Sequence, residues 1–101
     1  MAESFEDIAL QIAELLERKN HDYGNSYTRT RTMFGELAFV IRLYDKINRL
    51  VVLTKHKAMV DEAFEDTVRD IAGYCILELA FRQADKASQE ESKNDHNQHT
   101  K

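Results

Sequence analysis

The chain contains no proline and only three glycines in 101 residues. Proline and glycine are the residues that most disfavour a helix interior, so few positions force a helix to end. Alanine, leucine, glutamate and lysine, which favour helices, are plentiful. These features predict an all-α protein. The length predicts one domain with a modest core, for which a hydrophobic content of 43% is sufficient.

Apolar residues recur at helical spacing in three segments of the chain. Ser4 and Asp7 resemble a capping box in front of the first segment. The pattern predicts three helices, at about residues 4–19, 33–54 and 61–87. They are expected to form one antiparallel bundle within residues 1–87. Residues 88–101 contain no apolar side chain and are expected to be a disordered tail.

Charge and cysteine content narrow the class of protein. A net charge of −4 argues against general binding to duplex nucleic acid, which requires a broad basic surface. The single cysteine, Cys75, allows no disulfide within the chain and is typical of a reducing cytoplasm. The acidic first residues do not resemble a signal peptide, and no apolar run approaches the ~20 residues of a membrane span. A cytoplasmic protein is therefore expected.

The second half of the third predicted helix is unusually apolar. Between Gly73 and Phe81 only Glu78 interrupts the apolar residues. A helix that is apolar all round needs cover on all sides, which three helices of one chain do not supply. The sequence therefore predicts a homo-oligomer, most simply a dimer, with this segment at its interface.

The segment 20–32 differs from the rest of the chain in charge and pattern. It has turn-forming residues and no apolar period, which predicts a loop. From residue 18 to residue 32, four basic residues stand against one acid. Basic groups with interleaved aromatic rings suit a phosphate with an attached base. The alternative is a solvated loop whose tyrosines cap the core. The candidate ligand-binding residues here are His21, Tyr23, Tyr27, Arg29 and Arg31.

The third predicted helix carries a stripe of acids. Glu62, Asp66 and Asp70 fall one turn apart, in line with Gly73. Adjacent carboxylates repel one another, and a glycine costs about 1 kcal/mol against alanine inside a helix. The stripe therefore indicates a place where a cation, a ligand or another backbone approaches. The alternative is a solvated acidic face that complements the helix dipole.

The second predicted helix has an apolar side and a charged side. The apolar side consists of Leu37, Val40, Ile41, Tyr44, Ile47 and Val51, and the charged side of Arg42, Asp45, Lys46 and Arg49. Taken alone, the charged side is typical of an exposed ladder in which Asp45 pairs with Arg42 and Arg49. If it faces the acidic stripe of the third helix, the two helices form a polar pocket.

Three blocks of the sequence match a known family in order. They are KNHDYGNSY at 19–27, RLYDKINRL at 42–50 and DEAFEDTVRDIAGY at 61–74. In these blocks the chain resembles the nucleotide modification associated domain 1 family, which was formerly a domain of unknown function and is common in bacteriophages. The resemblance implies a phage protein in the host cytoplasm and a function connected with modified nucleotides.

More distantly, the paired helices are similar to the MazG-like all-α nucleoside triphosphate pyrophosphohydrolases. That family holds Mg²⁺ with an E-E-x-x-E stretch on one helix and an E-x-x-D stretch on the next. The resemblance implies a three-helix MazG-like bundle in which Asp70 matches the last aspartate, and Asp66 or Glu62 the glutamate before it. Asp45 matches one acid of the first stretch. Arg42 and Arg49 lie one turn to either side of it, where further acids would be expected.

Three functions follow as alternatives. The first is a nucleotide-binding protein in which Arg42, Lys46, Arg49 and the arginines of segment 20–32 bind phosphates, for handling or sequestering a modified or signalling nucleotide. The second is a Mg²⁺-dependent pyrophosphohydrolase whose acid Glu65 activates water. Its metal ligands would be Asp45, Glu62, Asp66 and Asp70. The third is a module that binds another protein through its apolar segment.

Overall fold

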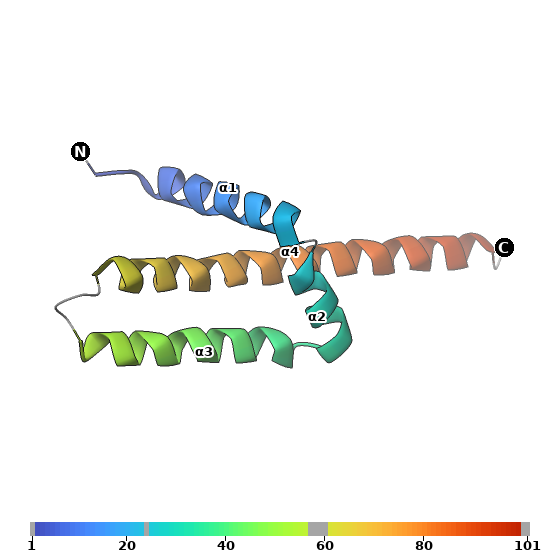
Figure 1. Cartoon of the computed structure of the whole chain (residues 1–101). Helices are drawn as coiled ribbons and strands as arrows, with labels where there is room; N and C mark the ends of the chain where they lie inside the picture. Colours follow the sequence, from blue (N-terminus) through green and yellow to red (C-terminus); the bar gives the residue numbers. More distant parts are fainter. Residues whose placement is uncertain (1, 24, 57–60, 100–101) are drawn as a thin grey trace.

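The computed structural model describes residues 2–23, 25–56 and 61–99, and only the backbone of residues 22, 23, 61 and 92–99. Within these residues it contains four helices and no strand: α1 (Phe5–Tyr23), α2 (Ser26–Phe34), α3 (Leu37–Thr54) and α4 (Asp61–His99). Figure 1 shows α4 in the middle, with α3 running antiparallel on one side and α1 on the other. The short α2 lies across the end of this layer. No helix in the described ranges has the length and apolar content that crossing a membrane requires.

The all-α prediction is confirmed, but the described residues form four helices in place of the three expected. The predicted loop 20–32 is wrong, because α1 continues to Tyr23 and α2 begins at Ser26. Asn25, in the left-handed region with φ 61°, joins the two helices. The buried positions of α2 are Tyr27 and Arg31, one turn apart. Because one of them is charged, an apolar period could not reveal this helix.

Two further helix boundaries differ from the sequence prediction. The second predicted helix begins at Leu37 and not at residue 33, because Gly35, with φ 76°, separates α2 from α3. The third continues to His99 and not to about residue 87. No glycine or proline follows Gly73, so nothing in the residues beyond 87 forces the helix to stop.

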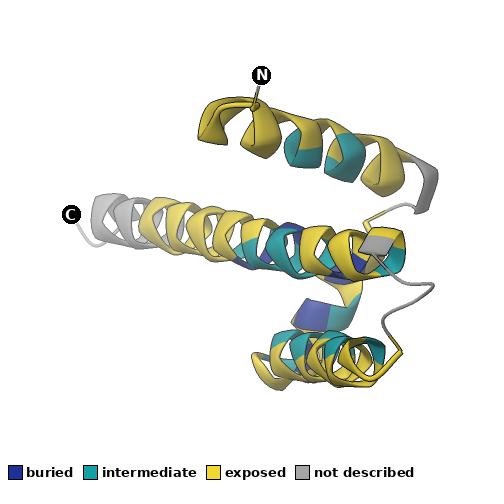
Figure 2. Cartoon of the chain, turned by 90° about the vertical axis from the view of Figure 1, so that its left-hand side faces the viewer, coloured by how far each residue is buried: buried dark blue, intermediate teal, exposed yellow. Residues whose placement is uncertain are grey.

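The centre of the fold is unusually polar. Among the described side chains, the buried apolar ones are Tyr27 and Ala38, and the buried polar or charged ones are Arg31, Thr67 and Glu78. Figure 2 shows that the buried positions gather where α2, α3 and α4 meet, while the outer sides of the helices are exposed. Contacts between charged groups therefore contribute much of what positions these helices.

α1 and α4 approach each other closely at Gly73. A Cβ placed at Gly73 would lie 3.0 Å from Leu16 Cδ2, and the glycine itself is buried. The close approach expected from the sequence is therefore made by a side chain of α1.

Gly73→Leu is expected to lower the free energy of unfolding by about 1–3 kcal/mol, the usual cost of overpacking, because the new side chain pushes α1 away from α4. Gly73→Ala should change it by less than about 1 kcal/mol, since its gain in helix propensity offsets the small shift of Leu16. Urea unfolding followed by circular dichroism measures both. Ala80→Leu, at an exposed position of α4, is the control. Equal effects of Gly73→Leu and Ala80→Leu would contradict the contact.

Candidate functional site

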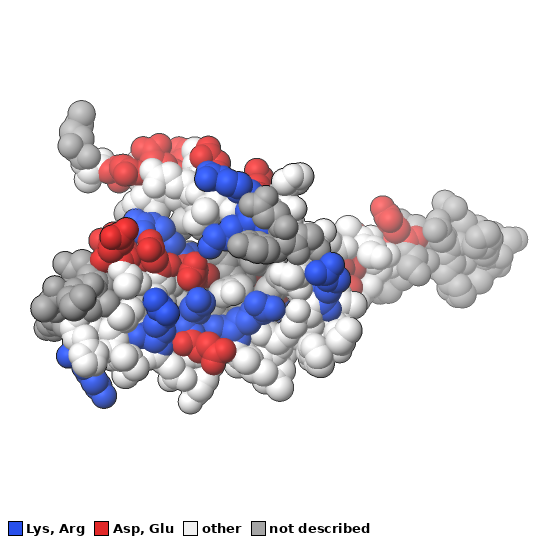
Figure 3. Space-filling view, viewed as in Figure 1, with Lys and Arg blue, Asp and Glu red and all other residues white. Residues whose placement is uncertain are grey.

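The charged side of α3 faces α4 and contacts it at three successive turns. Arg49 Nε donates a hydrogen bond to Thr67 Oγ1 over 3.2 Å. One turn along, Lys46 Nζ lies 3.2 Å from Asp70 Oδ2. One turn further, the guanidinium of Arg42 lies 5.6 Å from the ring centre of Tyr74. Figure 3 shows the corresponding band of Lys and Arg side chains over α3, beside a band of Asp and Glu over the first half of α4.

Asp70 links three helices. Besides Lys46 of α3, it attracts Lys19 of α1, whose Nζ lies 3.8 Å from Asp70 Oδ1. The side chains of Asp70 and Lys46 keep 33% and 29% of their surface exposed, and that of Lys19 keeps 52%. Both ammonium groups are therefore within reach of a solute.

Two tyrosine rings lie beside these cations. The ring centres of Tyr27 and Tyr74 are 6.2 Å apart with 35° between the ring planes. The guanidinium of Arg42 lies near both rings, 5.8 Å from the centre of Tyr27 and 5.6 Å from that of Tyr74. A cavity of about 260 Å³ opens beside them, lined by Leu16, Lys19, Asn20, Ser26, Tyr27, Tyr74 and Leu77.

We call Lys19, Tyr27, Arg42, Lys46 and Tyr74 the tyrosine–lysine site. Tyr74 and Asp70 are one turn apart on α4, as are Arg42 and Lys46 on α3, so Lys19, Lys46, Arg42 and Tyr74 lie near one another, with the buried ring of Tyr27 beside Arg42 and Tyr74. Three cations against the carboxylate of Asp70 leave a formal charge of +2 here, in a chain whose net charge is −4. The surface thus combines positive charge with aromatic rings, the combination that suits a phosphorylated base.

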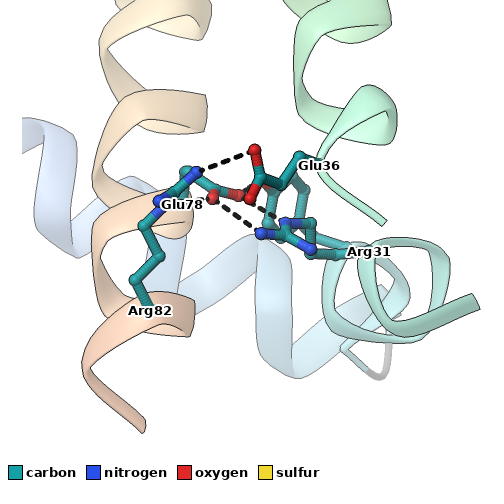
Figure 4. A network of polar contacts seen from close by, with 5 residues as sticks. Arg31, Glu36, Glu78 and Arg82 are labelled. Atoms are coloured by element: carbon teal, nitrogen blue, oxygen red, sulfur yellow. Dashed lines mark hydrogen bonds and ion pairs between the residues drawn. The ribbon is translucent and has the colours of Figure 1, made fainter. Parts of the chain in front are cut away.

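A buried cluster of charges holds Tyr27 in place. Glu78, which is 4% exposed, accepts hydrogen bonds from Tyr27 Oη (2.7 Å), from Arg31 Nε and Nη2 (2.8 and 3.1 Å) and from Arg82 Nε (2.6 Å). Figure 4 shows Arg31 of α2 and Glu78 and Arg82 of α4 converging, with Glu36 beside Arg82. Arg82 Nη2 lies 3.7 Å from Glu36 Oε2. A carboxylate bound by a bidentate arginine and a second cation is fully satisfied, which explains how a charge can be buried here.

The cluster fixes the protonation states of its members. The hydrogen bonds from Arg31 lower the pKa of Glu78 to about 2, and those from Tyr27 and Arg82 act in the same direction, against the effect of burial. Burial and the hydrogen bond to Glu78 raise the pKa of the Tyr27 hydroxyl above its usual value of 10. Tyr27 therefore keeps its proton and donates a hydrogen bond to Glu78, which holds its ring in place beside the cavity.

Stability should fall in acid because Glu78 must be ionised. The pKa of Glu78 is about 2 in the folded protein against an ordinary 4.5, so its contribution is complete above pH 4.5 and is lost as the pH falls toward 2. The free energy of unfolding, measured by urea at pH values across this window, should drop more steeply for the wild type than for Glu78→Gln. Glu65→Gln, at a side chain that is 68% exposed, should keep the wild-type slope. Equal slopes for all three proteins would contradict the ionised cluster.

A family model described as nucleotide modification associated domain 1 matches residues 19–80. The chain belongs to this family. The match begins at Lys19 and includes the whole tyrosine–lysine site and Glu78. No match was found among curated proteins or among solved structures.

In this member of the nucleotide modification associated domain 1 family, the predicted ligand-binding residues separate into groups. Tyr27, Arg42 and Lys46 lie together, and Arg49 lies one turn beyond Lys46. The expected pairs of Asp45 with Arg42 and Arg49 are replaced by contacts of the two arginines with other helices.

Of the remaining predicted ligand-binding residues, Arg31 is directed away from the tyrosine–lysine site. The guanidinium of Arg31 is buried against Glu78, so Arg31 does not face an open site. His21 and Arg29 are exposed, on α1 and α2. The side chain of Tyr23 lies outside the described residues.

The predicted metal ligands do not converge within the described residues. Asp45 and Glu62 are exposed on different helices, and Asp66 pairs with Arg69 over 3.1 Å. Glu65, the predicted base, lies 3.5 Å from the same arginine. Over the part of the chain that the structure describes, no three His, Cys, Asp or Glu side chains come together at a metal-sized site. Asp66 and Asp70 do line one cavity of about 340 Å³, with Leu15, Lys19 and Arg69.

Sequence reasoning missed four residues that matter in this family member. Lys19 and Tyr74 are in the matching blocks but were not assigned roles, and Thr67 carries no charge to mark it. Glu78 was visible as the single acid in an apolar run. A lone charge in such a run indicates a buried ion pair, which is the signal that could have revealed the cluster.

Proposed function

We propose that the protein binds a phosphorylated nucleoside at the tyrosine–lysine site, in order to handle or sequester a modified or signalling nucleotide. The observation that carries this proposal is the local charge of +2 beside two aromatic rings and a cavity, in a protein of net charge −4. Membership of the nucleotide modification associated domain 1 family supports a connection with nucleotides.

The phosphates bind to the cations around Asp70. Lys19 and Lys46 reach this carboxylate from opposite helices, and Arg42 lies one turn from Lys46. A phosphate carries more negative charge than one carboxylate and accepts several hydrogen bonds, so it competes well for both lysines. Arg42 adds a planar pair of donors that fits two phosphate oxygens.

The base stacks on the tyrosines. The cavity of about 260 Å³ lies slightly below the usual range of about 300–1,000 Å³ for small-molecule sites, so it suits one part of the ligand. We place the base there, against Tyr74, with the buried Tyr27 as part of the cavity wall, and leave the phosphates outside it over the lysines. Stacking of a base on an aromatic ring contributes about 1–3 kcal/mol and depends little on the base.

A thermal-denaturation screen tests the proposal. A ligand that binds the folded state at about 100 times its Kd stabilises it by about 2.7 kcal/mol, which raises the midpoint. Mono-, di-, tri- and cyclic nucleotides are compared with inorganic phosphate and with unphosphorylated nucleosides. At least one nucleotide should raise the midpoint in a concentration-dependent way, and more than phosphate or nucleoside alone. The absence of a shift with every nucleotide would contradict the proposal.

The second candidate is Mg²⁺-dependent pyrophosphohydrolysis, and one observation favours it. Asp66 and Asp70 line the same cavity as Lys19, and Mg²⁺ often takes one or two carboxylates together with phosphates and water. Asp70→Asn separates the candidates. For a binder, it removes the anion that occupies both lysines, so affinity is kept or increased. For a hydrolase, it abolishes Mg²⁺-dependent release of pyrophosphate from a nucleoside triphosphate.

A further inference from the structure

The outer side of α3 carries an uncovered apolar stripe. Its six members are each between 50% and 64% exposed: Leu37, Val40, Ile41, Tyr44, Ile47 and Val51. Leu37, Tyr44 and Val51 follow one another at intervals of seven residues, and so do Val40 and Ile47. Such spacing is typical of helices that pack along another helix.

The stripe lies opposite the functional site. Arg42, Lys46 and Arg49 turn toward α4, while the apolar residues turn away from it. In a single chain, the charged side of α3 therefore packs against α4, and the apolar side of α3 is exposed to solvent. A contiguous apolar surface of this kind marks an interface in most soluble proteins.

We infer that the stripe is covered by the same stripe of a second copy of the chain, in a two-fold symmetric dimer. The pattern is suited to pairing with itself, because Leu37 and Val51 lie equally far along the sequence from Tyr44, as do Ile41 and Ile47. In a two-fold contact, residue i of one copy meets residue j of the other and j meets i, so in an antiparallel pair centred on Tyr44 the residue Leu37 meets Val51 and Ile41 meets Ile47. Asp45 is the only charged residue between Leu37 and Val51 that is not directed toward α4, and none of the six residues of the stripe carries a charge.

The exposed area is close to the lower limit for a specific pair. Six half-exposed side chains present on the order of 500 Å² per chain, so pairing would bury about 1,000 Å² in total, close to the lower limit for specific interfaces. Met33 and Phe34, which are 73% and 66% exposed, extend the apolar surface beyond the end of α3. The described core of one chain is small, so the second copy supplies burial that the chain lacks.

This location differs from the interface expected from the sequence. In the segment 73–81, Gly73 and Glu78 are buried and several neighbours are half-covered by the chain's own helices. The α3 interface also leaves the tyrosine–lysine site of each copy open, since that site lies on the opposite side of the helix. A dimer would therefore have two separate ligand sites.

The mass of the full chain in solution, measured by sedimentation equilibrium without nucleotide, tests the inference. The wild type should have the mass of two chains, and Ile47→Asp should have half of it. Leu79→Asp, at a residue of α4 that is 62% exposed, is the matched control and should remain dimeric. A monomeric wild type, or equal dissociation of the two variants, would overturn the inference. Because no ligand is used, the result is independent of nucleotide binding.

Cysteine crosslinking tests the same contact if Ile47→Asp fails to fold. In a chain with Cys75→Ser, Tyr44→Cys should form a disulfide between two chains under mild oxidation, because residue 44 is at the centre of the stripe. Leu79→Cys in the same background should not form one. Equal crosslinking of both variants, or crosslinking of Leu79→Cys alone, would overturn the α3 interface.

Discussion

Glu78→Ala should lower the free energy of unfolding by about 3–5 kcal/mol, the usual cost of leaving a buried charge without its partner. Glu78 accepts hydrogen bonds from Arg31, which is 8% exposed, and from the hydroxyl of Tyr27. Small domains are stable by about 5–15 kcal/mol, so this loss could remove most of the stability. Urea unfolding followed by circular dichroism measures it.

Two further variants show whether the charge itself is responsible. Glu65→Ala removes an acid whose side chain is 68% exposed and pairs with Arg69, and it should cost less than about 1 kcal/mol. Combining Arg31→Met with Glu78→Leu removes both buried charges, so the double variant should be more stable than Glu78→Ala. If Glu78→Ala costs no more than Glu65→Ala, the cluster does not hold the fold together.

Arg42→Met should weaken nucleotide binding by about 10- to 100-fold. Hydrogen bonds to charged groups contribute about 1.5–3 kcal/mol each, and a tenfold change in Kd corresponds to about 1.4 kcal/mol. Methionine keeps much of the apolar contact with Tyr27 and Tyr74 but loses the phosphate donors and the charge over both rings. The measurement is isothermal titration calorimetry with the nucleotide that gives the largest thermal shift.

Lys55→Met is the control for this effect. Lys55 is exposed at the C-terminal end of α3. Its replacement by methionine removes one positive charge, as Arg42→Met does, but at a distance from the tyrosine–lysine site. Its affinity should match that of the wild type in physiological salt, because screening limits the reach of a surface charge to about 8 Å. If the two variants weaken binding equally, then net charge and not the tyrosine–lysine site governs binding.

The grouping of the basic residues on one side of α3 was predictable from the sequence, but their partners were only partly so. Residues three or four apart on a helix share a side, so the spacing of Arg42, Lys46 and Arg49 places their side chains on the same side of α3. The sequence placed carboxylates opposite them, and only Asp70 takes that position. Asp66 lies one turn earlier and pairs with Arg69 of its own helix.

The features that sequence reasoning missed depend on contacts between distant segments. The α2 helix buries Arg31. This burial is favourable only because Glu78, 47 residues away in the sequence, accepts its hydrogen bonds and balances its charge. A period of apolar residues cannot detect such a helix. The unfavourable helix propensity of Gly73 indicated that another group approaches the third predicted helix at this position. Only the fold shows that this group is the side chain of Leu16. The apolar side of α3 was visible in the sequence, whereas its outward orientation was not.

Binding of a phosphorylated nucleoside where α1, α3 and α4 meet is best tested by a nuclear magnetic resonance titration of the isotope-labelled protein. The nucleotide that gives the largest thermal shift is added stepwise, and changes in the amide and aromatic signals are mapped. The account predicts saturable changes that are largest at Lys19, Tyr27, Arg42, Lys46 and Tyr74. Saturable changes centred elsewhere, such as the apolar cavity between Ile12 and Phe64, would contradict it, as would the absence of any change.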